Sequence, residues 1–209
     1  MRVVVFGASG GTGKQVVLQL LEAGHLVTAF VRTSLKFNLQ HLNLNVFQGD
    51  VLDAEKVEQA IAGQDAVISA LGPTRTSVPD MMETAAKNII SAMQKHGVKR
   101  LISTTGAGVD DPQDRPKLFD KAMKKLLTLM AEDVLRDSEA NVNLIRSSNL
   151  DWTIVRFPRL INGAHTGQYR VGYIGKDSGI QLSRADAADF IVNALGNGEY
   201  IHKAPVVSY

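Results

Sequence analysis

A glycine-rich turn lies directly after the first apolar segment of the chain, and this feature most narrows the choice of fold. Residues 3–6 form an apolar run that is long enough only for a buried strand. The turn itself reads Gly7-Ala8-Ser9-Gly10-Gly11-Thr12-Gly13. Residues 14–23 follow, with apolar side chains at helical spacing at Val16, Val17, Leu20 and Leu21. The order of strand, tight turn and helix predicts the first βα unit of a doubly wound α/β sheet.

Three glycines of this turn have separate expected roles. Gly7 lets the chain turn off the strand, Gly10 lets backbone N–H groups approach a pyrophosphate, and Gly13 lets the helix pack closely. The positive end of the helix dipole then faces the anion. The turn therefore predicts a dinucleotide-binding site. The alternative is an ordinary βα turn, where glycines also gather without binding a ligand.

The rest of the chain continues the alternation of strands and helices. Apolar segments predict strands at residues 26–31, 45–50, 65–73, 101–105 and 151–156, with an edge strand at 204–208. Helices are predicted at 54–62, at 79–96, over a stripe of Phe119, Met123, Leu127, Met130 and Val134, and after a cap at Ser183. Residues 160–182 are rich in glycine and predict only short strands such as 168–173. The expected fold is a doubly wound, Rossmann-like α/β fold with a mostly parallel sheet and helices on both faces.

Composition argues against several classes of function. Lys and Arg number 23 against 21 Asp and Glu, so the net charge of +2 lacks the strong field of a nucleic-acid or membrane-surface binder. The chain has no cysteine, which excludes disulfides, thiolate metal sites and cysteine nucleophiles, and no metal site is predicted. No apolar run approaches the roughly 18 residues of a membrane span. We expect one cytoplasmic domain over residues 1–209 that binds a small molecule, with no nucleic-acid or membrane partner.

The second predicted strand ends on a basic residue. An acidic residue at this place binds the ribose 2′-OH of NAD, whereas a basic residue suits the 2′-phosphate of NADP. Here the position holds Arg32, followed by Thr33, Ser34 and Lys36. A guanidinium, two hydroxyls and an ammonium group form a suitable anion pocket, so NADP is the expected cofactor. The alternative is that Arg32 is a solvated cation at the end of a strand.

Three other strands end on residues suited to a binding site. Asp50 follows the third strand and is expected either near an adenine edge or as a turn residue. The fourth strand breaks at Gly72-Pro73, where the ribose and pyrophosphate of a dinucleotide would cross the sheet edge. Thr104 and Thr105 end the fifth strand, where a doubly wound sheet places its reacting substrate.

Seven segments together resemble the atypical short-chain dehydrogenase family, in particular its small branch with flavin reductase and biliverdin-IXβ reductase. The glycine spacing G-x-x-G-x-x-G is typical of short-chain dehydrogenases. The segments span nearly the whole chain and read GASGGTG, VTAFVR, GQDAVISALG, KNIISAMQKHGVKRLISTTGAG, NLDWTIVRFPRL, TGQYRV and SRADAADFIV. The sequence departs from the branch at two positions, where Gly106 replaces a serine and Arg159 replaces a histidine.

The resemblance implies where an NADP molecule would lie. It implies that Ser9, Gly11 and the turn residues Gly7, Gly10, Thr12 and Gly13 surround the pyrophosphate, and that Arg32 and Thr33 meet the 2′-phosphate. It further implies adenine near Asp50 and Val51, and the path of the cofactor along Ala70, Leu71 and Gly72. Thr104 and Thr105 would lie beside the nicotinamide, with Pro158 and Arg159 over its carboxamide.

The typical short-chain dehydrogenase uses Tyr-x-x-x-Lys as its proton donor, and this chain has no such pair. Flavins and quinones accept hydride directly and can take a proton from solvent, so orientation of two rings is sufficient for them. We therefore expect an NADPH-dependent reductase of a flavin-like or quinone-like acceptor, with Thr104 and Thr105 as positioning groups. Its substrate side would be formed mainly by residues 106–118 and 157–182. The alternatives are an NADP(H)-binding redox sensor without turnover, and a reductase or isomerase of an unrelated metabolite.

Overall fold

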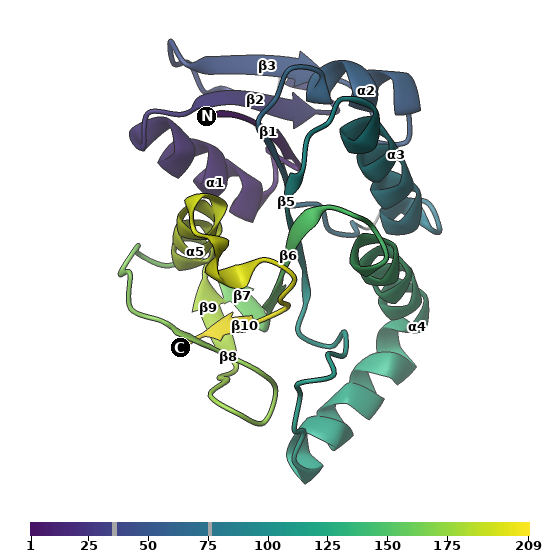
Figure 1. Ribbon diagram of the computed structural model, residues 1–209. Coiled ribbons are helices and arrows are strands. Elements are labelled where there is room, and N and C mark those ends of the chain that lie inside the picture. The colour runs from purple at the N-terminus through teal and green to yellow at the C-terminus, as the bar shows by residue number, and fades with distance from the viewer. Residues whose placement is uncertain (35–36, 75–76) are drawn as a thin grey trace.

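The computed structural model describes residues 1–34, 37–74 and 77–209, without the side chains of residues 119, 123 and 126–130. In this part of the chain, eight strands form one sheet in the order β3-β2-β1-β4-β5-β6-β10-β8 (Figure 1). The strands are β1 (Arg2–Phe6), β2 (Leu26–Val31), β3 (Leu44–Gln48), β4 (Ala66–Ser69), β5 (Arg100–Gly106), β6 (Asp151–Phe157), β8 (Arg170–Gly172) and β10 (Val206–Ser208). All neighbouring pairs are parallel except β10 and β8.

The strand order reverses between β1 and β4. From β1 the chain proceeds outward through β2 and β3, and it then returns to pair β4 with the other side of β1. Adjacent parallel strands whose connections leave in opposite directions open a crevice at their carboxyl ends. The order is that of a doubly wound sheet, which confirms the predicted fold class.

Helices cover both faces of the sheet (Figure 1). On one face α1 (Gly11–Glu22) packs beside α5 (Arg184–Gly196), and on the other lie α2 (Ala54–Ile61), α3 (Met81–Lys95) and α4 (Leu118–Arg146). Strand alternation produces the two cores: Val3 and Val5 join the first face, and Val4 and Phe6 join the second. Each face of the sheet therefore has its own core, and the packing of the helices against both faces fixes the strand ends relative to the helices.

Several predicted boundaries are wrong: the first helix is longer than predicted, and the third and fourth strands end earlier. α1 begins at Gly11 rather than residue 14, because the second half of the glycine turn is already helical. β3 ends at Gln48 and β4 at Ser69, so Asp50 and residues 70–73 belong to loops beyond the sheet. A separate two-stranded parallel sheet, β7 (Arg159–Ile161) with β9 (Gln181–Ser183), was not predicted.

The predicted apolar stripe on α4 is only partly described. The side chains of Phe119, Met123, Leu127 and Met130 lie outside the described part of the chain, and Val134 is 43 % exposed, against the prediction. α4 is interrupted at Ala131, whose φ and ψ of −151° and 45° are not helical. The interruption divides α4 into two helical segments, and it lies between the first four residues of the predicted stripe and Val134.

Among the described residues, no helix combines the length and the apolar character needed to cross a membrane.

Candidate functional site

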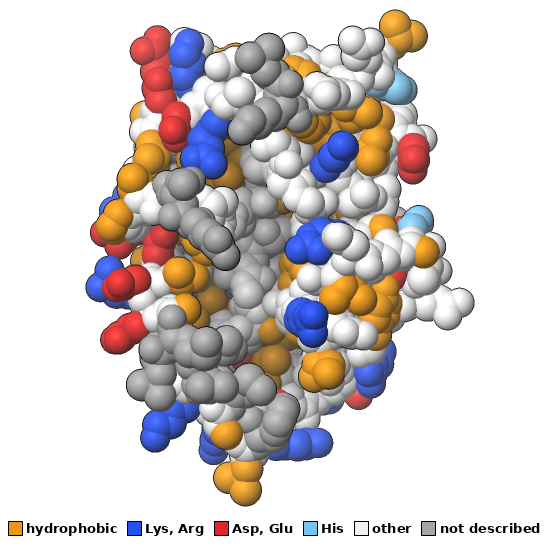
Figure 2. Space-filling view, turned by 180° about the vertical axis from the view of Figure 1, so that it is seen from behind, with side chains coloured by type: hydrophobic (Ala, Val, Ile, Leu, Met, Phe, Trp, Pro, Cys, Tyr) orange, Lys and Arg blue, Asp and Glu red, His pale blue; other side chains and the backbone are white. Residues whose placement is uncertain are grey.

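Two pockets lie side by side at the carboxyl ends of the strands and share Ala70, Leu71 and Gly72. We call them the β2 pocket, which contains Arg32 and Asp50, and the β5 pocket, which contains Thr104 and Thr105. Their volumes are about 290 and 330 Å³, near the lower end of the roughly 300–1,000 Å³ typical of ligand pockets. Figure 2, which views the molecule from the side opposite to Figure 1, shows a hollow along the middle of that face. The two pockets together form one groove across the switch point, as a dinucleotide requires.

The glycine turn brings backbone, not side chains, to the middle of this groove. Gly7 has a positive φ of 76°, and a Cβ there would lie 2.6 Å from the carbonyl oxygen of Ala70. A Cβ on Gly13 would lie 2.1 Å from the carbonyl oxygen of Gly7, so both positions exclude larger residues. Gly10 is different, because its Cβ would meet only the Gly7 carbonyl oxygen, at 3.2 Å. Gly10 thus leaves its outer side open to a ligand.

The first turn of α1 presents its N–H groups beside Gly10. Gly10 is the N-cap residue of α1 and has no side chain with which to cap the helix. Uncapped N–H groups and the positive end of the helix dipole together favour an anion. The residues of this turn therefore fit a dinucleotide pyrophosphate.

The β2 pocket gathers residues expected around the pyrophosphate and the adenosine. Gly7, Ser9, Arg32, Asp50 and Val51 all line it. Asp50 lines the pocket and accepts a hydrogen bond from the Leu52 N–H at 3.0 Å, as a turn residue does. Its place near an adenine edge stays a prediction. Thr33 is exposed at the end of β2 without lining the pocket, and Lys36 lies outside the described residues.

The β5 pocket gathers residues expected around the pyrophosphate, the nicotinamide and an acceptor. Thr12, Thr104, Thr105 and Pro158 line it, together with Leu160 from the predicted acceptor side. Met82, Ser138 and Arg184 also line it, and the sequence did not indicate them. Among the described lining residues, hydroxyl and apolar side chains dominate, and Arg184 is the one ionisable group. A pocket of this kind can orient a ring, but it offers no described side chain that exchanges a proton near neutral pH.

The segment after β6 explains why only some predicted residues reach the groove. Pro158 and Leu160 line the β5 pocket, whereas Arg159 between them is exposed and lines neither pocket. Successive residues of a strand point to opposite sides, and β7 begins at Arg159. A contact between Arg159 and the carboxamide needs its side chain to turn back toward the groove, and it stays a prediction.

A residue of α4 fixes the start of α3 beside the groove. The carboxylate of Asp137 is buried and accepts hydrogen bonds from the N–H groups of Met82 and Glu83, both at 2.9 Å. Asp80, the N-cap residue of α3, has a positive φ of 55° and makes no such bond. Asp137 therefore caps α3 from a neighbouring helix and holds Met82 against the β5 pocket.

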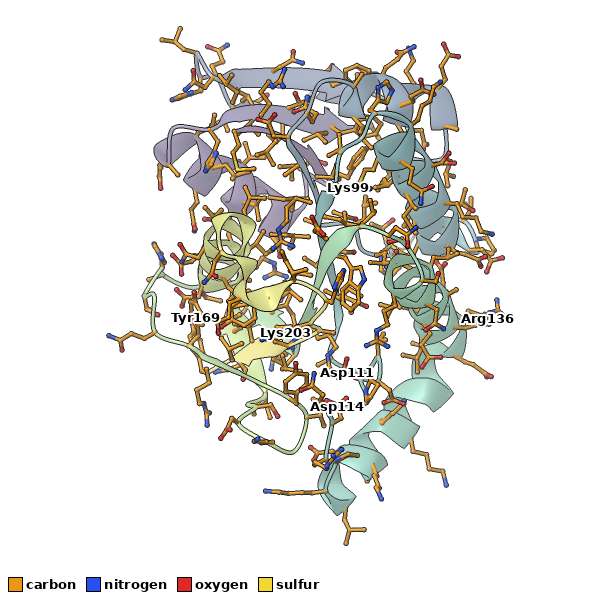
Figure 3. All side chains as sticks on the ribbon, viewed as in Figure 1. Lys99, Asp111, Asp114, Arg136, Tyr169 and Lys203 are labelled. Carbon is orange, nitrogen blue, oxygen red and sulfur yellow. The ribbon has the colours of Figure 1, made fainter. Side chains whose placement is uncertain are left out.

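The tyrosines lie outside the linings of both pockets. Tyr169 lies near α5 (Figure 3) and its hydroxyl donates to Asp189 at 2.7 Å, and burial raises the pKa of Tyr169. The Tyr209 hydroxyl donates to Asp186 at 2.6 Å. Burial alone raises the pKa of Asp186, but hydrogen bonds from Tyr209 and Thr166 prevail and lower it to about 2. These groups attach the loop before β8 and the C-terminus to α5 and take no part in the groove.

No group of three or more His, Asp or Glu side chains in the described chain is arranged to hold a metal ion.

The fold and groove define a dinucleotide-binding α/β protein. A family model described as NAD(P)H-binding matches residues 7–198, and the chain belongs to this family. The match agrees with the family-level resemblance to atypical short-chain dehydrogenases read from the sequence segments.

Individual relatives are more distant. Photosystem II assembly factor Ycf39 of Synechocystis sp. is 26 % identical over 208 residues, which cover 93 % of this chain but only 58 % of Ycf39. A structure of ChuY, an anaerobillin reductase from Escherichia coli O157:H7, superposes with a TM-score of 0.77 at 23 % identity, covering 100 % of this chain and 97 % of ChuY. A short-chain dehydrogenase/reductase from Veillonella parvula, solved with NADP, gives 0.80 at 20 % identity, covering 100 % and 94 %. At these identities the structural likeness shows the fold.

Proposed function

We propose that this protein is an NADPH-dependent oxidoreductase that transfers hydride to a flavin-like or quinone-like aromatic acceptor. The observation that carries the proposal is the β5 pocket, which continues the proposed dinucleotide groove and is lined mainly by hydroxyl and apolar groups. The ChuY likeness adds that this fold serves an anaerobillin reductase in another protein. The NAD(P)H-binding family supplies the cofactor class.

The division of the groove supports NADPH with its adenosine in the β2 pocket. Arg32 at the rim of that pocket supplies a cation for the 2′-phosphate, and Gly10 and the first turn of α1 suit the pyrophosphate. The nicotinamide would then lie in the β5 pocket against Thr104 and Thr105. NADPH supplies a hydride when it is bound.

The chain's own residues would orient the two rings. The hydroxyls of Thr104 and Thr105 can donate hydrogen bonds to, or accept them from, a carboxamide or a ring system. The Ser138 hydroxyl donates to the Val134 carbonyl oxygen at 2.7 Å, so it can accept a hydrogen bond from the ligand. Phe157, Pro158 and Leu160 would exclude water on one side of the pocket. The proton that follows the hydride would come from solvent. We extend the proposal to residues 106–118 and 157–182 as the acceptor side of a single domain.

The test is a turnover assay with a small panel of acceptors. Purified protein and NADPH are mixed with FMN, FAD, a benzoquinone or biliverdin, and absorbance is followed at the nicotinamide band. Loss of that absorbance with at least one acceptor is the expected result. Tight NADPH binding without oxidation by any member of the panel would instead support the redox sensor, which the scarcity of ionisable groups in the β5 pocket also suits.

A further inference from the structure

Arg184 is the residue of the groove that the functions above leave unexplained. It lines the β5 pocket with Thr12, and no other described lining residue of that pocket carries a charge. Pockets fix ligand orientation through a small number of polar groups on mainly apolar walls. The single guanidinium therefore has a large influence on which molecule the pocket accepts.

The Arg184 side chain is held in place by packing over Gly11 and by a hydrogen bond to Asn162. A Cβ built on Gly11 would lie 2.8 Å from both Cδ and Nε of Arg184, so the side chain lies directly over the first residue of α1. Its Nη1 donates to Asn162 Oδ1 at 2.9 Å, from the segment between β7 and β8. Gly11 leaves the space that the guanidinium uses, which gives this glycine a role apart from the turn itself.

The polar partner of Arg184 is neutral. The nearby carboxylate of Asp186 is occupied by Thr166, Gly167 and Tyr209 instead. Within the described residues, no Asp or Glu forms an ion pair with Arg184. Arg184 is also the first residue of α5, where the helix dipole disfavours a cation. The guanidinium thus stands without a described counter-charge at the wall of a ligand pocket.

We propose that Arg184 binds an anionic oxygen group, a phosphate or a carboxylate, of the molecule in the β5 pocket. The inference rests on the proposed function for its choice of ligand. Two sources can supply such a group: the phosphate of NADP next to the nicotinamide, and an anionic substituent on the acceptor. The planar guanidinium suits either group, because it can donate two parallel hydrogen bonds to it. The acceptor would then be an anionic aromatic molecule such as FMN, rather than a neutral one such as riboflavin.

The experiment measures binding, so that it does not depend on turnover. Arg184→Met and Arg184→Lys are compared with the wild type and with Arg2→Met, a control at the amino end of β1 whose surface pair with Asp65 is remote from the groove. In the first arm, calorimetry gives the Kd for NADPH alone. In the second arm, protein saturated with NADP⁺ is titrated with FMN or riboflavin, which share a ring system and differ by one phosphate. Circular dichroism and thermal unfolding confirm that each variant is folded.

Arg184→Met should weaken one of these interactions by about 10- to 150-fold, the value expected for a charge-assisted hydrogen bond. A loss for FMN with riboflavin and NADPH unchanged identifies the acceptor as the source. A loss for NADPH, with both flavins affected equally, identifies the cofactor phosphate. Arg184→Lys should fall between the wild type and Arg184→Met, since it keeps the charge and loses the paired donors.

A folded Arg184→Met protein with wild-type Kd values in both arms would overturn the proposal. If the wild type neither binds nor reduces any flavin, the proposed acceptor class is wrong, and the first arm alone decides the role of Arg184. An unchanged Kd for NADPH would then overturn it as well.

Discussion

The Arg156 guanidinium and the Asp114 carboxylate form a two-bond ion pair, with Nη1 and Nη2 lying 2.7 and 2.8 Å from the two carboxylate oxygens. Arg156 comes from β6 and is fully buried, while Asp114 lies on the loop between β5 and α4 (Figure 3). The same carboxylate accepts hydrogen bonds from the N–H groups of Asp111 and Ile174. The pair therefore fastens both segments of the proposed acceptor side, residues 106–118 and 157–182, to the central sheet.

Removal of the Asp114 charge should destabilise the protein strongly. Burial alone raises the pKa of Asp114, but Arg156 prevails and holds that pKa below its usual range. Asp114→Asn leaves a buried guanidinium without its counter-charge, which typically costs about 3–5 kcal/mol of unfolding free energy. Urea unfolding checks this value, with Asp65→Asn on the exposed Arg2 pair as a control that should change little. A loss for Asp114→Asn no larger than for the control would show that the pair does not stabilise the fold.

Gly10→Val should abolish NADPH binding in a folded protein. The Cβ of residue 10 would find open space except for the Gly7 carbonyl oxygen at 3.2 Å, and that space is where the pyrophosphate is proposed to lie. Gly13→Val provides the contrast, because its Cβ would meet the same oxygen at 2.1 Å and should prevent correct folding. Calorimetry and circular dichroism separate the two effects. Normal NADPH binding by Gly10→Val would make Gly10 only a turn glycine.

Arg32→Ala should weaken NADP(H) binding and leave NAD(H) binding nearly unchanged. Arg32 lines the β2 pocket, and the charge-assisted hydrogen bond to a 2′-phosphate corresponds to a roughly 10- to 150-fold change in Kd. Titration of both cofactors measures the ratio, with Arg2→Ala as the charge-matched control. Equal losses for NADP(H) and NAD(H) would contradict the assignment of Arg32 to the 2′-phosphate.

The stability contributed by Asp186 should disappear in acid. Its pKa of about 2 lies below the usual value of 3.8, so its contribution is complete above about pH 4 and is lost as the pH falls toward 2. Asp186→Asn should therefore lower the unfolding free energy by about 2 kcal/mol at pH 7, and this difference from the wild type should shrink between pH 4 and 2. Glu22→Gln, on the exposed side of α1, serves as the control. A difference for Asp186→Asn that is independent of pH would contradict the assigned pKa.

The helices and strands that were predicted correctly are those whose signals lie within a few neighbouring residues. The apolar run before Gly7, the helical spacing after it and the cap at Ser183 each depend on neighbouring residues, and Ser183 Oγ does accept from the Asp186 N–H at 3.0 Å. The pairing of β7 with β9 was missed because three-residue strands distant in sequence carry too little alternation to be recognised. The prediction that Arg159 lies in the groove rested on the resemblance alone. It did not consider that neighbouring residues of a strand point to opposite sides, so that Arg159 is exposed while Pro158 and Leu160 line the β5 pocket.

The sequence also missed the residues that the topology brings to the groove from a distance. Ser138 lies on a helix that was predicted only in outline, and Arg184 was read as part of a helix cap. Neither residue has a local pattern that marks a site, since its position depends on how α4 and α5 pack against opposite faces of the sheet. A lone arginine at a helix start, where the dipole disfavours it, is the one signal that a sequence could offer for Arg184.

The last prediction concerns catalysis and separates hydride transfer in an orienting site from proton-transfer chemistry. Thr104 and Thr105 line the β5 pocket, and loss of a neutral hydrogen bond of about 0.5–1.5 kcal/mol permits only a roughly 2- to 15-fold fall in turnover. We therefore expect NADPH-dependent FMN reduction to fall by less than about 20-fold in Thr104→Val and in Thr105→Val. Steady-state kinetics check this, with Ser91→Ala on the exposed side of α3 as a hydroxyl control.

The pH profile supplies the second half of that test. Because Arg184 is the one ionisable group among the described lining residues of the β5 pocket, turnover should show no sharp step between about pH 6 and 8. Loss of a general acid or base would instead reduce turnover by about 100- to 10,000-fold. A fall of about 1,000-fold in either threonine variant would therefore mean that the hydroxyl takes part in proton transfer, and that the acceptor is not a flavin.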